Sequence, residues 1–147
     1  MLCCVAAAPA AGQQLTATEM SAGVCALVSG RDFVGASGSV GRRVDNQTRM
    51  VGTAAAGMLG SDPAVRVEAQ AQLIVNPSGR GGAGLYAGAG VAWQGATGVP
   101  GGGYLTALLG LESAPGARRG WYAEIGLGGG VRLALGARWR RFPPWWR

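Results

Sequence analysis

Five ionisable residues of this chain have the types and spacing that could support acid–base chemistry. Three are carboxylic acids and two are arginines: Glu19, Arg66, Glu68, Glu124 and Arg132. Two carboxyl groups in different environments can divide the roles of general acid and general base. Glu68 and Glu124, however, have arginines on their own faces, which favours structural ion pairs because buried charges must be compensated. We expect Glu124 to pair with Arg132, and Arg66 with Glu68 or a neighbour, with Gln70 in the same polar network.

The rest of the sequence offers little catalytic chemistry. The chain has no histidine, which removes the usual general base for a serine or cysteine nucleophile and the commonest metal ligand. The glycine triplets 101–103 and 128–130 lack the lysine and the following helix of a phosphate-binding loop. Cys25 lies within a predicted strand, where a small buried apolar residue is the expected role. We therefore predict no enzyme, no cofactor and no metal site.

Composition and charge favour one ordered domain. The 147 residues include 28 glycines, only 14% are charged, and the mean hydropathy is +0.20, whereas disordered chains are more charged and less apolar. All 13 basic residues are arginine, and the pI is about 10.3. No basic helix, zinc-ligand spacing or aromatic RNA-binding signature accompanies these arginines. We therefore predict no nucleic-acid partner.

The elements that position the ionisable residues are predicted to be β-strands. Apolar and polar residues alternate with a period of two, as they do when successive side chains point to opposite faces of a sheet. The segment 48–59 has an alanine-rich centre that could face either way, and 95–103 is expected to be a glycine-rich loop. Turn residues separate the segments. The predicted strands are 17–28, 32–43, 48–59, 64–75, 82–94, 104–113, 120–127 and 131–141.

One face of these strands is apolar and could contact either a protein core or lipid. The other face is rich in glycine, which suits the interior of a narrow barrel better than a water-facing surface. All ten aromatic residues lie near predicted strand ends, as in the interfacial girdles of transmembrane barrels. The proposed girdle is Trp93, Tyr104, Trp121, Trp139 and Phe142, with Phe33, Tyr86 and Tyr122 at the same ends. The alternative is a soluble exported barrel that binds a small apolar ligand inside, as lipocalin-like proteins do.

The N-terminus has the small residues of a secretory signal, and the chain continues with eight amphipathic strands, the last of which ends in aromatics. In these features the chain resembles the small eight-stranded outer-membrane β-barrels of Gram-negative bacteria. The resemblance covers about Thr16 to Phe142 and implies an all-β, closed antiparallel up-and-down transmembrane barrel in the outer membrane. It divides the chain into a residual or truncated signal peptide (1–14), a barrel domain (15–142) and a short tail (143–147).

The same resemblance implies the lipid bilayer as a partner, insertion by the barrel assembly machinery, and a monomer. An eight-stranded barrel is just wide enough for its own side chains. We therefore expect a structural or interaction role, with an interior plugged by arginine, glutamate and glutamine and with no open pore.

Many arginines fall near the predicted end that carries both termini. If this end faces the periplasm, they form a basic rim that attracts anionic headgroups. The arginines assigned to the rim are Arg42, Arg43, Arg49, Arg80, Arg118, Arg119, Arg138, Arg140, Arg141 and Arg147. The opposite end has only short connections apart from 95–103, which weakens an adhesin function.

Overall fold

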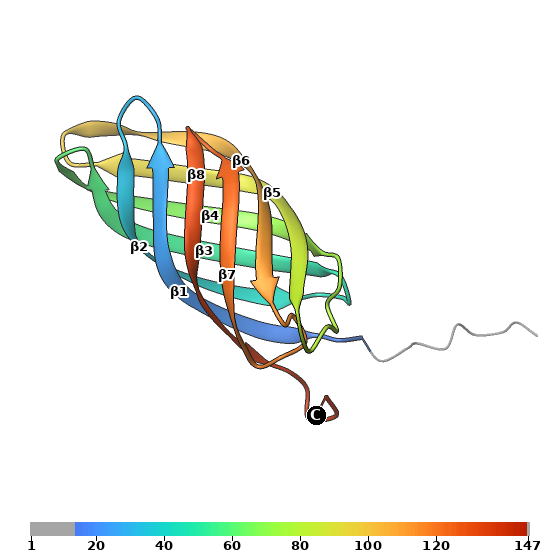
Figure 1. Cartoon of the computed structure of the whole chain (residues 1–147). Helices are drawn as coiled ribbons and strands as arrows, with labels where there is room; N and C mark the ends of the chain where they lie inside the picture. Colours follow the sequence, from blue (N-terminus) through green and yellow to red (C-terminus); the bar gives the residue numbers. More distant parts are fainter. Residues whose placement is uncertain (1–13, 147) are drawn as a thin grey trace, which may run out of the picture.

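The computed structural model describes residues 14–146, which form a closed barrel of eight antiparallel strands (Figure 1). Each strand pairs with the next along the chain, and β8 pairs back with β1. The strands are β1 (Ala17–Val28), β2 (Phe33–Arg43), β3 (Thr48–Leu59), β4 (Asp62–Ile74), β5 (Ala83–Ala96), β6 (Val99–Ser113), β7 (Arg119–Leu127) and β8 (Val131–Arg141). The all-β, up-and-down fold predicted from the sequence is thus confirmed. All of the predicted signal peptide 1–14 except Gln14 lies outside the described residues.

Period-two alternation sets the two faces of the barrel wall. Along β4, Val65, Val67 and Leu73 are exposed on the outside, while Arg66 and the alternate residues after it are buried inside. The undecided strand β3 follows the same rule: its inward residues include Arg49, Ala55 and Leu59, and its outward residues include Met50 and Met58. Between residues 14 and 146, no helix is long and apolar enough to cross a membrane.

The barrel has two ends that differ in their connections. At the terminal end, where β1 begins and β8 ends, the connections are 44–47, 75–82 and 114–118. At the far end they are 29–32, 60–61, 97–98 and 128–130. The expected glycine-rich loop 95–103 is wrong, because Ala96 pairs with Val99 across a turn of Thr97 and Gly98. Gly98 has φ +71, a left-handed conformation that glycine adopts without steric cost.

Glycines make room for the large side chains inside the barrel. Tyr86 pairs with Gly110, and a Cβ at Gly110 would collide with the Tyr86 ring. Tyr122 pairs in the same way with Gly136. Phe33 is fully buried. The expectation that these three aromatic rings join an interfacial girdle is therefore wrong, because their strand parity turns them inward.

An apolar cluster fills part of the interior next to the far end. Its large members at this end are Leu27, Phe33 and Leu59, which lie where β1, β2 and β3 meet the far-end turns, and Tyr122 of β7 joins the cluster. Cys25 belongs to the same cluster as a buried free thiol, in keeping with the buried apolar role expected for it. The remaining interior is mostly polar, and it holds the candidate functional site.

Candidate functional site: the buried ionic network

The barrel interior contains an extended network of charged side chains. The buried charged residues are the arginines Arg43, Arg49, Arg66, Arg132, Arg138 and Arg140 and the glutamates Glu19, Glu68, Glu112 and Glu124. The residues expected from the sequence, namely Glu19, Arg66, Glu68, Gln70, Glu124 and Arg132, are all buried here. Sequence reasoning left out Glu112 and four arginines. For Arg138 and Arg140 strand parity carried the signal, because both share the face of Arg132. Arg49 lies on the segment 48–59, whose orientation the sequence left open.

The first part of the network, the Glu112 cluster, comprises Glu19, Glu112, Arg43, Arg49, Arg138 and Arg140. One carboxylate oxygen, Glu112 Oε2, accepts hydrogen bonds from Arg49 Nη1 at 3.1 Å, from Arg140 Nη2 at 3.0 Å and from Arg138 Nη1. Glu19 accepts from Arg43 Nε at 2.6 Å and from Arg49 Nη1 at 2.6 Å. Two carboxylates thus serve four guanidinium groups.

The second part, the Glu68 cluster, comprises Glu68, Glu124, Arg66 and Arg132. Glu68 Oε1 accepts from Arg66 Nε at 2.6 Å and from Arg132 Nε at 3.1 Å. Arg132 Nη1 donates to Glu124 Oε2 at 2.7 Å. The structure therefore contains both ion pairs that the sequence suggests, Arg66 with Glu68 and Arg132 with Glu124.

Two amides and one tyrosine join the two clusters. Along the inner face of β4, Gln70 Nε2 donates to Glu68 Oε2 at 3.1 Å, and Gln72 Nε2 donates to Gln70 Oε1 at 3.0 Å. Gln72 Oε1 in turn accepts from Arg49 Nη2 at 2.7 Å. Tyr86 donates to Glu124 Oε1 at 2.6 Å, and its ring lies 4.8 Å from the Arg49 guanidinium carbon. The interior is therefore one connected hydrogen-bonded network.

The outermost arginines of the network bind backbone carbonyls of the turns. At the terminal end, Arg43 donates to Pro77 O at 2.9 Å and to Pro115 O at 2.7 Å, and Arg140 donates to Ala117 O at 3.1 Å. At the other end, Arg66 donates to Gly128 O at 2.9 Å. These carbonyl dipoles receive part of the positive charge that the four glutamates leave uncompensated. The network therefore also fixes the turns that close the barrel.

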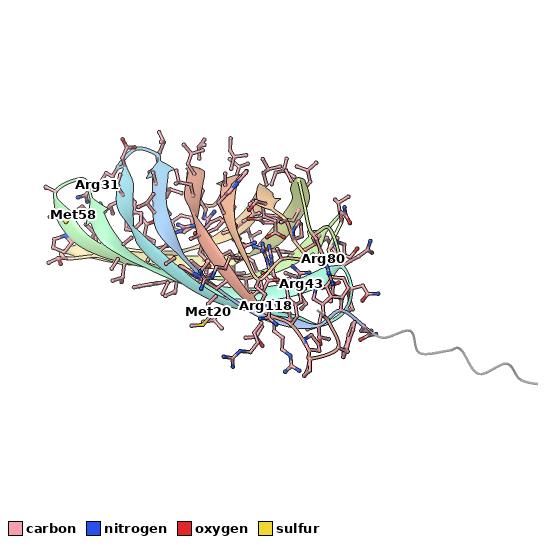
Figure 2. The ribbon with its side chains drawn as sticks, turned by 60° about the horizontal axis from the view of Figure 1, so that its bottom comes forward. Met20, Arg31, Arg43, Met58, Arg80 and Arg118 are labelled. Atoms are coloured by element: carbon pink, nitrogen blue, oxygen red, sulfur yellow. The ribbon has the colours of Figure 1, made fainter. Side chains whose placement is uncertain are left out.

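The expected basic rim is partly wrong. Arg43, Arg49, Arg138 and Arg140 point into the barrel and pair with glutamates. The exposed arginines of the terminal end within the described residues are Arg42, Arg80, Arg118, Arg119 and Arg141. Figure 2 shows Arg43 and Arg118 at this end of the molecule. The rim is therefore smaller than predicted, because four of the ten assigned side chains satisfy interior charges.

Little empty space remains inside the network. A cavity of about 10 Å³ lies among Ser21, Ser39, Gln70, Glu124 and Arg132, which is room for about one water molecule. No group of three or more His, Cys, Asp or Glu side chains within residues 14–146 could hold a metal ion. The four glutamates are each engaged by arginine. The arrangement is suited to fixing the barrel walls relative to one another.

The outer face of the barrel is an apolar belt. Its members are at least partly exposed and come from all eight strands; they include Val24, Val40, Met58, Val67, Leu85, Leu105, Ile125 and Leu135. Leu105 is 83% exposed and Leu135 is 61% exposed, which in water would be a large uncompensated apolar surface. This distribution rules out an apolar ligand cavity lined by that face, as the lipocalin-like alternative requires.

The five expected girdle aromatics occupy different positions. Trp93, Trp121 and Trp139 lie on the outer face, the first near the far end and the other two near the terminal end. Tyr104 has the inward parity and lies against Gly129 of the far-end turn. Phe142 follows β8, and its ring contacts Trp146 and the guanidinium of Arg43. Tyr104 and Phe142 therefore cover the two ends of the barrel.

A closed antiparallel barrel with its apolar side chains outside and its charges inside has the architecture of an outer-membrane β-barrel. Solved structures share this fold. The N-terminal β-barrel domain of Pseudomonas aeruginosa OprF matches with a TM-score of 0.69 at 16% identity, covering 87% of this chain and 98% of that one. Neisserial surface protein A (NspA) matches with a TM-score of 0.59 at 16% identity, covering 84% and 96%.

The attachment invasion locus protein Ail of Yersinia pestis matches with a TM-score of 0.52 at 15% identity, covering 88% of this chain and 99% of that one. At these identities the likeness establishes the fold, and the predicted resemblance to small outer-membrane barrels is confirmed at that level. No protein-family model matches the sequence, and no curated protein matches it at a significant level.

Proposed function

We propose that this protein is an outer-membrane barrel with a structural or interaction role, closed to solutes by its own side chains. The observation that carries the proposal is the sidedness of the wall, with an apolar exterior around a charged interior. A bilayer accepts this arrangement because each strand satisfies its backbone groups through its neighbours in a closed barrel. The outward tryptophans near both ends suit the headgroup regions.

Three features support a closed interior. The apolar cluster of Leu27, Phe33 and Leu59 occupies the far-end part, and the ionic network fills the middle. At the terminal end, Pro115 is buried next to Gly84, and Gly116 N donates to Gly79 O at 2.7 Å. The connections 75–82 and 114–118 therefore pack against each other across this end. A hydrated ion has no continuous path through such an interior.

The network also argues for a non-catalytic role. A general acid or base needs a proton-transfer partner within reach and a pKa near the operating pH. Here each buried carboxylate is hydrogen-bonded to at least one guanidinium, so each is occupied by a structural partner. We propose, further, that the protein acts as a monomer and is inserted by the barrel assembly machinery, with the outer-membrane bilayer as its main partner.

Folding into lipid vesicles tests the proposal. The purified chain should require detergent or lipid to stay in solution, and the folded barrel should change its electrophoretic mobility on heating. In planar bilayers it should show no steady conductance. A chain that is freely soluble without detergent and binds an apolar fluorescent probe would overturn the membrane role. A steady ohmic conductance would overturn the closed interior while leaving the membrane role intact.

A further inference from the structure

Two adjoining hollows mark the outer wall near the terminal end. The first, the rim hollow, has a volume of about 460 Å³ and is bordered by Arg118, Arg119 and Arg141. The second, the outer groove, has a volume of about 670 Å³ and runs over β1, β2 and β3. Met20 and Trp139 border both hollows. Figure 2 shows Met20 and Arg118 at this end of the barrel.

The rim hollow has the chemistry of an anion site. Arg118, Arg119 and Arg141 are exposed, and no hydrogen bond or ion pair engages their guanidinium groups within residues 14–146. Register brings them together, since Arg119 pairs with Trp139 and Arg141 pairs with Thr18. The arginines of the network, by contrast, donate to buried glutamates and to turn carbonyls. Guanidinium groups bind phosphate oxygens well because their planar donors match two oxygens at once.

The outer groove is apolar and hollow because small residues line its floor. Ala22 pairs with Gly38, Gly38 pairs with Ala54, and Val40 pairs with Gly52. A Cβ added at Gly38 would have its nearest contact at 3.7 Å and one at Gly52 at 4.0 Å. These two glycines are therefore not required by packing against neighbouring strands, and they leave open a channel that begins at Met20 and Trp139.

We propose that the two hollows together form a binding site for one anionic phospholipid, with the phosphate at Arg118, Arg119 and Arg141 and one acyl chain in the outer groove. The continuity of a cationic hollow with an apolar groove favours a lipid over a free phosphate ion, which would use only the first. Trp139 lies at the junction, at the level where tryptophan meets headgroups. The inference rests on the proposed membrane role.

Brominated lipids test the site, because they quench tryptophan fluorescence only at close range. A variant that keeps Trp139 as its sole tryptophan is folded into phosphatidylcholine vesicles that contain a minor fraction of phosphatidylglycerol. Either lipid carries the bromine atoms in turn. Brominated phosphatidylglycerol should quench Trp139 more strongly than an equal fraction of brominated phosphatidylcholine. Native mass spectrometry of the full chain with all its tryptophans should retain phosphatidylglycerol preferentially.

Matched variants separate a site from general surface charge. R118Q/R119Q should lower the preference for phosphatidylglycerol by about fivefold or more. R42Q/R80Q removes the same charge from the same end and should leave the preference within about twofold of the wild type. Gly38→Val should reduce quenching by filling the groove. Gly103→Val, at an outward glycine whose added Cβ would have its nearest contact at 4.0 Å, should not.

The outcomes distinguish this site from the membrane role. If both double variants lower the preference equally, or if neither does, the site is overturned while insertion stands. If brominated phosphatidylglycerol quenches Trp139 equally in Gly38→Val and Gly103→Val, the assignment of an acyl chain to the outer groove is overturned. Quenching by neither lipid, together with unchanged mobility on heating, would show that the chain does not insert, and this would overturn the proposed membrane role first.

Discussion

The two ionic clusters in the barrel interior differ in their charge balance. The Glu68 cluster has two arginines for two glutamates and is neutral, whereas the Glu112 cluster has four arginines for two glutamates. The additional guanidinium groups are those that reach the turns of the terminal end, through Arg43 and Arg140. The Glu68 cluster therefore serves mainly the wall, with one bond to a far-end turn through Arg66. The Glu112 cluster connects the wall to the closure of the terminal end.

The comparison predicts that Glu112→Gln is the most damaging change. Three guanidinium groups share Glu112 Oε2. The variant therefore leaves four buried arginines with Glu19 as the only other carboxylate of the cluster, while Glu124 lies 3.6 Å from Arg138. The free energy of unfolding should fall by about 3–5 kcal/mol, as measured by urea titration of the vesicle-folded protein. Thr106→Val is a matched control, because Thr106 is buried on the same strand and its hydroxyl has no hydrogen-bond partner. A loss no larger than that of the control would contradict the prediction.

Glu124→Gln in the neutral cluster should cost less, about 2 kcal/mol, because Arg132 keeps its hydrogen bond to Glu68 and Tyr86 can still donate to the amide oxygen. The same urea titration measures the loss. Adding Arg132→Met should restore part of it by removing the charge left over. Strictly additive losses in the double variant would show that the two side chains are not coupled.

Arg43→Met should loosen the turns that close the terminal end while leaving the stability of the barrel wall nearly unchanged. It removes the bonds to Pro77, Pro115 and Glu19 but leaves Glu19 paired with Arg49. Because the Glu112 cluster has four arginines for two glutamates, the free energy of unfolding should fall by only about 1 kcal/mol. Trypsin should cut faster after Arg80 and Arg118, which lie within the released turns. Arg42→Met, one residue away and facing outward, provides the control. Equal cleavage rates in the two variants would be evidence against the role of Arg43.

The smallest expected effect concerns the connection 44–47, which the network does not reach. There the pKa of Asp45 lies below its ordinary value because the backbone N–H groups of Gln47 and Thr48 donate to the carboxylate. Because the pKa is depressed in the folded state, ionised Asp45 stabilises the turn at pH values above the unfolded pKa of about 3.9. This stabilisation is lost as the pH falls through the folded pKa. The amide shifts of Gln47 and Thr48 should therefore titrate below about pH 3.9. Asp45→Asn should abolish the titration, and a midpoint at or above the ordinary value would contradict the assignment.

The sequence predicts the wall of the barrel well because alternation is a local signal. The bounds of β1, β3 and β8 agree with the predicted segments, and parity correctly assigns Arg66, Glu68 and Glu124 to the interior. The sequence-based prediction fails where contacts between distant strands determine the partners of a side chain. Glu112 meets its arginines only because the barrel closes, bringing β3, β6 and β8 together around one carboxylate.

The ends of the strands were harder to predict than their centres. Glycines at 95 and 101–103 indicate a loop, yet the Trp93 ring covers Gly95 and Gly101 and the strands continue beneath it. Arg138 and Arg140 were assigned to a rim by their position along the chain, although their parity matches that of Arg132. A guanidinium near a strand end can reach inward as easily as outward. Its direction is set by the partners it meets in the closed barrel.

The brevity of the far-end connections has a consequence for recognition. The turns 60–61 and 97–98 join their strands through two residues each, so almost no polypeptide extends beyond the barrel there. If this end faces the outside of the cell, antibodies, phages and host receptors would meet lipid and sugar before they meet protein. In that orientation, the protein surface open to recognition would be the apolar wall and the terminal end.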